Sequence, residues 1–148
     1  MAKQYGKLIL GGATFELDDC EDTRLYIFES DEYEDTFTVS FDARFKKGIF
    51  NSEEVLPYIS IGEHETNKSE ISEITGDVYS VDSPEEADER EDLLYIYEHE
   101  PFEKYSLKIL EMSGKMVHIS IEGTAITYGY SVPYETADFS GDFWLRCR

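Results

Sequence analysis

The clearest pattern of hydrophobic and polar positions is in residues 36–45, TFTVSFDARF. Apolar side chains occupy every second position, at Phe37, Val39, Phe41, Ala43 and Phe45. Because successive side chains of a strand point to opposite faces, this period of two predicts a strand with one face in the core. The polar residues between them predict a solvated second face.

Three shorter strands are expected before this segment. Residues 7–10 (KLIL) and 13–17 (ATFEL) flank Gly11 and Gly12, and two glycines that tolerate positive φ favour a tight hairpin turn. Residues 23–30 (TRLYIFES) read as a third strand, with alternating sides. The N-terminal third is therefore predicted to be a meander.

The same alternation returns in the C-terminal half. Residues 103–112 and 115–127 are separated by Ser113 and Gly114, so they are expected to pair as a hairpin with their apolar faces on one side. Segments 93–100 and 138–147 are rich in aromatic and large apolar side chains, and 55–62 and 72–83 resemble shorter strands. The pattern predicts a mainly β fold, a single domain over 1–148, built as an antiparallel sandwich or barrel of about nine or ten short strands.

Only two places favour a helix. At residues 52–56, Ser52 precedes two glutamates and Pro57 would end a single turn. At residues 84–92, Ser83 is an expected N-cap, Pro84 suits the first helical position, and Glu86 completes the pattern of a capping box. We therefore predict one or two short helices.

The net charge of the chain narrows the range of functions that can be expected. The chain of 148 residues carries 13 basic and 33 acidic residues, a formal net charge of −20, which disfavours direct binding to nucleic acid or to an anionic membrane. No apolar run is long enough for a membrane span or a signal peptide. We expect a cytoplasmic protein in which Cys20 and Cys147 are reduced, with one disulfide between them as the alternative.

The acidic residues gather in three windows, 16–22, 29–35 and 82–92, which hold 17 of the 33. Solvated loops are one interpretation. The sharper hypothesis is a docking surface for a basic protein, because complementary charge accelerates encounter. Tyr33, an aromatic side chain amid these acids, would be an anchor. The predicted partner-binding residues are Asp18, Asp19, Asp31, Glu32, Tyr33, Glu34, Asp35, Asp88, Glu89, Glu91 and Asp92.

Motifs for catalysis, cofactors and metals were also considered. The acidic loops lack the EF-hand pattern, and the sequence contains no phosphate-binding or dinucleotide-binding glycine motif and no G-x-S-x-G. The triplets Glu63-His64-Glu65 and Glu98-His99-Glu100 are expected at exposed strand ends, because neighbouring strand side chains point apart. No catalytic residue, metal ligand or cofactor is therefore predicted, and the chain is not expected to be an enzyme.

The leading hypothesis is a non-enzymatic acidic protein, a monomer or weak homodimer, that neutralises or sequesters a basic protein partner. Its most concrete form is a bacterial immunity or antitoxin-type inhibitor of a toxin or nuclease. The alternative is a β-barrel or sandwich that binds a small apolar ligand or a carbohydrate through aromatic side chains. The ligand contacts would then be Tyr128, Tyr130, Tyr134 and Trp144.

Overall fold

The computed structural model describes residues 5–30, 34–130 and 132–147 and is mainly β, with 64% strand and 7% helix. The elements of the first half are β1 (Gly6–Leu10), β2 (Ala13–Asp18), β3 (Arg24–Glu29), β4 (Phe37–Phe45), β5 (Gly48–Phe50), β6 (Glu53–Val55) and β7 (Tyr58–Thr66). Those of the second half are the 3₁₀ turn η1 (Ile71–Glu73), β8 (Val78–Val81), α1 (Pro84–Arg90), β9 (Leu93–Tyr95), β10 (His99–Ser113), β11 (Met116–Tyr128) and β12 (Glu135–Cys147).

Eight antiparallel strands form a closed barrel. Their order is β1-β2-β4-β7-β9-β10-β11-β12, and β12 pairs with β1 to close it. β3, β8 and the β5–β6 hairpin lie outside this path. The predicted fold class is confirmed, and of the two architectures left open the barrel is the one formed. The strands β5 and β6 were not expected, because three-residue strands carry too few positions to show alternation.

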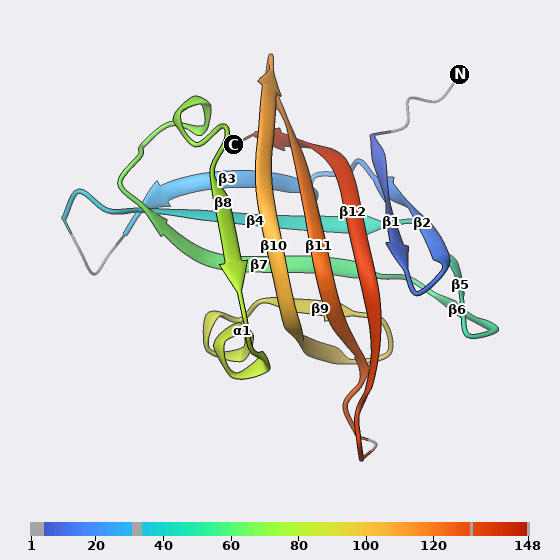
Figure 1. The fold of residues 1–148 in the computed structure, drawn as a ribbon. Helices are drawn as coiled ribbons and strands as arrows, with labels where there is room; N and C mark the ends of the chain where they lie inside the picture. The colour runs from blue at the N-terminus through green and yellow to red at the C-terminus, as the bar shows by residue number, and fades with distance from the viewer. Residues whose placement is uncertain (1–4, 31–33, 131, 148) are drawn as a thin grey trace.

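The core lies between two crossing layers of this barrel. Figure 1 shows β10, β11 and β12 running steeply across β3, β4 and β7. The rings of Phe41 and Phe45 from β4 meet Phe143 from β12 edge to face, with centroids 6.2 and 5.6 Å apart. All three side chains are buried. Large rings therefore occupy the centre, where the two layers cross, and their burial stabilises the fold.

The predicted alternation in β4 is confirmed on the apolar face and is wrong at two positions of the polar face. Val39, Phe41 and Phe45 are buried as expected, but Thr38 and Ser40 are buried as well. The Ser40 hydroxyl donates a hydrogen bond to the Gly62 carbonyl of β7. A small polar side chain satisfied inside its own sheet needs no solvent, so its polarity did not reveal its burial.

The Gly11–Gly12 hairpin is confirmed, with φ of 56° and 100°, but the N-terminal meander is wrong. β2 pairs with β4 only at Leu17 and Asp18, and β3 takes the rest of the same edge of β4. β3 then meets the end of β12 in a short parallel pairing. β4 is longer than either neighbour, so two strands share its edge, and strand length alone does not reveal such sharing.

The helix expected at 52–56 is also wrong. Asn51 and Ser52 form the turn of the β5–β6 hairpin, with positive φ values of 49° and 67°. The buried Val55 and Phe50 hold the hairpin against the barrel, and the hydroxyl of Tyr97 donates to the Phe50 carbonyl. This long-range packing outweighs the local signal of Ser52 and the glutamates, since a single helical turn has little stability of its own.

The second helix is confirmed, two residues shorter than expected. The Ser83 side chain accepts a hydrogen bond from the Glu86 amide, and Pro84 begins the helix. The Glu86 carboxylate accepts from the Asp82 amide rather than from Ser83. Glu91 ends the helix in the left-handed region with φ of 61°. The Ser83 cap was therefore readable from local sequence, whereas the exact end was decided by the chain's turn into β9.

Candidate functional site

The predicted partner-binding residues lie in separate places. Asp31, Glu32 and Tyr33 are outside the described residues. Asp18 ends β2, and Asp19 pairs with Arg146, with Oδ2 2.7 Å from the guanidinium. The remaining surface acids are exposed: Glu34 and Asp35 between β3 and β4, and Asp88, Glu89 and Glu91 in and after α1.

Two of the three acidic windows, 82–92 and 29–35, approach each other. Glu89 and Glu91 line a groove of about 510 Å³ together with Tyr26 and Phe28 of β3. Phe28 directly precedes Glu29, the start of the second acidic window. The structure thus brings the acids of α1 to the face where β3 ends, whereas Asp18 and Asp19 precede the opposite end of that strand.

Asp92 was expected on the acidic surface, and this placement is wrong, because its side chain is buried. Its Oδ1 accepts from the Gly62 amide at 2.5 Å, and its Oδ2 accepts from the Tyr105 hydroxyl at 2.5 Å. The Arg90 Nε lies 3.5 Å from Oδ2. A buried carboxylate persists only where such donors and an opposite charge compensate its lost hydration. Asp92 is therefore a structural acid.

His64 extends this buried network and was also misplaced by the sequence, which predicted an exposed strand end. Its Nε2 lies 2.5 Å from the Tyr105 hydroxyl. Because that hydroxyl donates to Asp92, His64 donates from Nε2 to the tyrosine oxygen. Burial and the Arg90 charge lower the pKa of His64 to about 3, so the ring is neutral at physiological pH.

The network fills a gap in hydrogen bonding between strands. β9 pairs with β7 only at residues 58–60, so among the described residues no strand pairs with β7 on that side beyond Ser60. The Asp92 carboxylate takes the place of a strand for the Gly62 amide. A Cβ at Gly62 would lie 2.1 Å from the Arg90 carbonyl, so only glycine lets the end of α1 approach this closely.

Acidification should weaken the fold through His64. The pKa of this ring lies near 3 in the folded protein and near its ordinary 6.5 when unfolded. Its stabilising contribution is therefore complete above pH 6.5 and is lost as the pH falls toward 3. Between pH 7 and 5 we expect the free energy of unfolding of the wild type to fall by about 2 kcal/mol relative to His64→Phe.

Urea unfolding of the wild type and of His64→Phe between pH 7 and 5 measures this difference in the free energy of unfolding. Burial raises the pKa of Asp92, which acts in the opposite direction, but that carboxyl is present in both proteins and its contribution largely cancels. Parallel pH profiles for the two proteins would show that His64 does not titrate as its burial requires.

Three aromatic side chains and one arginine form a row on the outer wall of the barrel. Four residues on adjacent strands β4, β7, β9 and β10 stand in register: Arg44, Tyr58, Tyr95 and His99. The rings of Tyr58 and Tyr95 stack with centroids 5.4 Å apart, and the Arg44 guanidinium lies 4.9 Å from the Tyr58 ring centre. The exposed His99 lies 2.5 Å from the Tyr58 hydroxyl through Nε2. The sequence did not reveal this row, since its members are far apart along the chain.

Three hollows follow one another from this row along the β5–β6 hairpin, and we call them together the tyrosine furrow. The first, of about 420 Å³, contains Arg44, Glu53, Glu54, Tyr58, Tyr95 and Tyr97. The second, of about 330 Å³, is lined by Asn51, Glu53, Tyr97, Tyr128 and Glu135. The third, of about 390 Å³, contains Asn51, Thr127, Glu135 and Ala137. The first two hollows share Glu53 and Tyr97 and the last two share Asn51 and Glu135, so the three adjoin one another.

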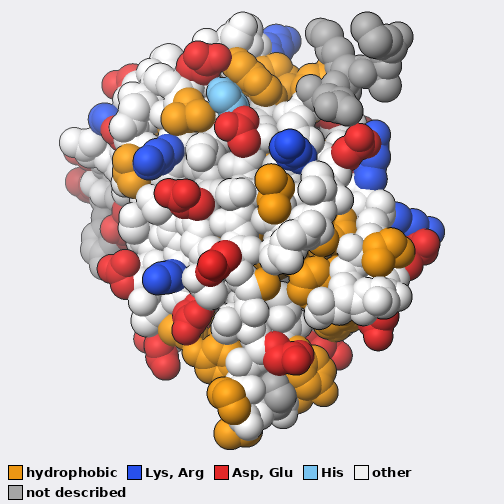
Figure 2. All heavy atoms as spheres, turned by 45° about the vertical axis from the view of Figure 1, so that its right-hand side comes forward, with side chains coloured by type: hydrophobic (Ala, Val, Ile, Leu, Met, Phe, Trp, Pro, Cys, Tyr) orange, Lys and Arg blue, Asp and Glu red, His pale blue; other side chains and the backbone are white. Residues whose placement is uncertain are grey.

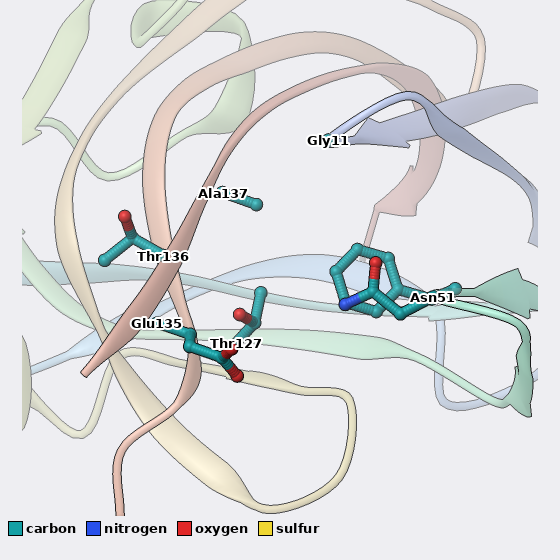
Figure 3. A pocket seen from close by; sticks show the side chains of 7 residues that line it. Gly11, Asn51, Thr127, Glu135, Thr136 and Ala137 are labelled. Atoms are coloured by element: carbon teal, nitrogen blue, oxygen red, sulfur yellow. The ribbon is translucent and has the colours of Figure 1, made fainter. Parts of the chain in front are cut away.

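Figure 3 shows the third hollow from close by. Thr127 and Glu135 face it from the barrel wall, and Asn51 faces it from the turn of the β5–β6 hairpin. The hairpin therefore forms one bank of the furrow and the ends of β11 and β12 form the other. The segment 52–56, which was expected to be a helix, supplies part of the surface of the furrow.

The furrow ends at the loop between β11 and β12, the aromatic tip, made of residues 128–130 and 132–134. Its exposed side chains are Tyr128 at 39%, Tyr130 at 73%, Val132 at 101% and Tyr134 at 40%. Figure 2 shows hydrophobic side chains gathered with carboxylates at this lower end of the molecule. The Tyr134 hydroxyl donates to Glu103, 3.4 Å away. Three of the four aromatic residues predicted as alternative ligand contacts are thus brought together here.

Trp144, the fourth, lies elsewhere. It stands ten residues from Tyr134 along β12, or about 30 Å in an extended strand, and stacks on His118 with centroids 4.8 Å apart. Its strand neighbours Phe143 and Leu145 are buried, so Trp144 and His118 face outward. The Nε2 of His118 lies 2.6 Å from Asp142. Trp144 and the aromatic tip do not form one site.

The described residues offer little support for metal or disulfide chemistry. They include no group of three or more His, Cys, Asp or Glu side chains placed to hold a metal ion. His64 contacts Tyr105 and His99 contacts Tyr58, so the two histidines take part in different contacts. Cys20 and Cys147 are free. In the part of the chain that the structure describes, no helix has the length and apolar character to cross a bilayer.

Comparison of the chain with family models, with curated proteins and with solved structures finds no match. What the fold and the site define is a closed antiparallel β-barrel with buried aromatic clusters and an exposed furrow of tyrosines and carboxylates. A functional conclusion therefore rests on this geometry.

Proposed function

We propose that this protein is a non-enzymatic binding protein that recognises a basic protein partner through the tyrosine furrow and the aromatic tip. The observation that carries the proposal is the exposure of Tyr130 and Val132, at 73% and 101%, in a projecting loop. Exposed rings amid polar groups are frequent anchors of protein interfaces, because they bury a large area at low entropic cost.

The charges around these rings favour a basic partner. Desolvation and the nearby carboxylates of Glu103 and Glu85 raise the pKa of Tyr134. Desolvation and the carboxylates of Glu53 and Glu135 raise the pKa of Tyr97. The same surface therefore combines aromatic faces with negative potential, which attracts a basic protein and repels an acidic one. The net charge of −20 extends this attraction over longer distances.

The most concrete form of this proposal is neutralisation of a toxin or nuclease in the cytoplasm. A nuclease presents a cationic substrate site, and an acidic protein that covers it competes with the nucleic acid. The acids of the windows 29–35 and 82–92, including Asp88 and Glu89, would steer the encounter, while the aromatic tip provides the anchor.

A carbohydrate ligand is the second candidate, and one observation favours it. The stacked Tyr58 and Tyr95 line the first hollow, and Asn51, Thr127 and Glu135 line the two hollows after it. Flat rings together with hydroxyl, amide and carboxylate groups along one surface suit the faces and hydroxyls of a sugar. The barrel centre is filled by Phe41, Phe45 and Phe143, so this ligand would bind on the outer wall.

The test is affinity capture from the source organism's lysate with the wild type and with Tyr130→Ala. We expect the wild type to retain a basic protein whose purified form binds directly, more weakly at high salt, and at least about tenfold more weakly to the variant. Val78→Ala, which changes an exposed residue of β8, is the matched control. A glycan-array hit together with no protein partner would replace the proposal by the second candidate.

A further inference from the structure

The second hollow of the furrow lies where three separate segments meet. Asn51 and Glu53 come from the β5–β6 hairpin, Tyr97 follows β9, and Tyr128 and Glu135 come from the facing ends of β11 and β12. Its volume is about 330 Å³, enough for one long side chain rather than a helix or a strand. The hollow is thus built by tertiary structure and sized for a single group.

The polar groups around this hollow carry negative charge. Glu53 and Glu135 both act on Tyr97 and contribute to its raised pKa, after desolvation. No Lys or Arg is among the residues that line it. Among the described residues, neither Glu53 nor Glu135 forms an ion pair. Two carboxylates that share a small volume repel each other unless a cation lies between them.

The adjoining hollow shows the same chemistry with a cation in place. There the guanidinium of Arg44 lies over the Tyr58 ring, 4.9 Å from its centre, and forms an ion pair with Asp22 at 3.5 Å. A tyrosine face of the furrow and the carboxylate of Asp22 outside it thus hold the guanidinium of Arg44. Rings attract cations through their negative faces, and the attraction grows as water is excluded.

We propose that the hollow between Tyr97 and Tyr128 receives one Arg or Lys side chain of the protein partner, held by the faces of the two rings and by the carboxylates of Glu53 and Glu135. This inference rests on the proposed function and specifies the partner's contact group. The Asn51 side chain, on the hairpin bank, offers a further acceptor. An anionic group is disfavoured by the two carboxylates, and a neutral one would leave their charge uncompensated.

The test uses small probes and therefore does not need the partner. Protein resonances are followed by NMR while N-acetyl-argininamide is added, with N-acetyl-citrullinamide as the neutral probe of nearly the same shape. We expect saturable shifts at Tyr97 and Tyr128 with the arginine probe, and binding at least about fivefold weaker with citrulline. Equal binding of the two probes, or shifts confined to other residues, would overturn the inference.

Two double variants separate the hollow from the overall charge. Glu53→Gln with Glu135→Gln should weaken the arginine probe about fivefold or more, whereas Glu111→Gln with Glu122→Gln removes the same charge from exposed positions of β10 and β11 and should change its affinity less than about twofold. Equal losses in both variants would show that only net charge matters and would contradict the inference.

The outcomes for the two proposals are distinguishable. Partner binding that depends on Tyr130 but not on Glu53 and Glu135 would refute the cation hollow and leave the proposed function standing. Arginine binding in the hollow without any basic protein partner would support the cation hollow and refute the proposed function.

Discussion

Asp92→Ala should lower the free energy of unfolding by about 3 to 5 kcal/mol, because it leaves buried donors without an acceptor. The Gly62 amide and the Tyr105 hydroxyl both donate to this carboxylate, and the Arg90 Nε lies 3.5 Å from it. Loss of the carboxylate also removes the tie between the end of α1 and β7. Urea unfolding followed by circular dichroism measures the change through the shift of the midpoint.

Asp88→Ala is the matched control for this experiment, since Asp88 is an exposed acid of α1 and its removal should change stability by less than about 0.5 kcal/mol. Asp92→Asn should cost less than Asp92→Ala, because the amide oxygen still accepts from Gly62. If Asp92→Ala changed the free energy of unfolding as little as Asp88→Ala, the Asp92 carboxylate would be a surface group. Its buried position between β7 and the end of α1 would then be wrong.

Phe143→Ala should lower the free energy of unfolding by about 3 to 5 kcal/mol as well, through a cavity in the barrel centre. The side chain is fully buried and its ring contacts Phe41 and Phe45 from the opposite layer. The two crossing layers are too rigidly hydrogen-bonded to close over the space, so both the transfer energy of the ring and the packing contacts are lost. Thermal and urea unfolding give the change.

Phe28→Ala serves as the comparison, because Phe28 is 40% exposed at the end of β3 and should lose about 1 kcal/mol or less. A small effect at Phe143 would indicate that the core repacks, and the crossing arrangement of β4 and β12 would then not determine stability.

These two sites are separate from the tyrosine furrow. Asp92 joins α1 to β7, and Phe143 lies inside the barrel, whereas Glu53, Tyr130 and Glu135 are exposed at its end. Variants of the furrow should therefore bind differently without unfolding, and variants of the network or core should unfold without a direct effect on the binding surface. This separation makes the functional proposals testable in folded protein.

Local patterns predicted the elements whose causes are local. The alternation in 36–45 marked β4, the glycines at 11 and 12 marked a hairpin, and Ser83 marked the start of α1. Each of these depends on backbone preferences and on the period of side chains along a few residues. The segment 52–56 shows the limit, because its short helical signal was overruled by packing of the β5–β6 hairpin against the barrel.

The candidate site was predicted only where it is contiguous. Tyr128, Tyr130 and Tyr134 could be recognised as an aromatic loop from the sequence, and they form the aromatic tip. The other bank of the furrow, with Glu53 and Tyr97, could not, because those residues are 75 and 31 positions from Tyr128. Asp92 and His64 were misplaced for the same reason, since the partners that bury them come from β7 and β10.

The sequence by itself determined the β class, the main hairpins, the short capped helix and the strongly negative charge, since these follow from local periodicity, turn chemistry and composition. Only the tertiary structure decided how the barrel closes, which acid is buried and which tyrosines share a surface. The physical reason is that closure brings together strands far apart in the chain. Whether a polar side chain such as Asp92 is solvated or buried then depends on partners that no local pattern encodes.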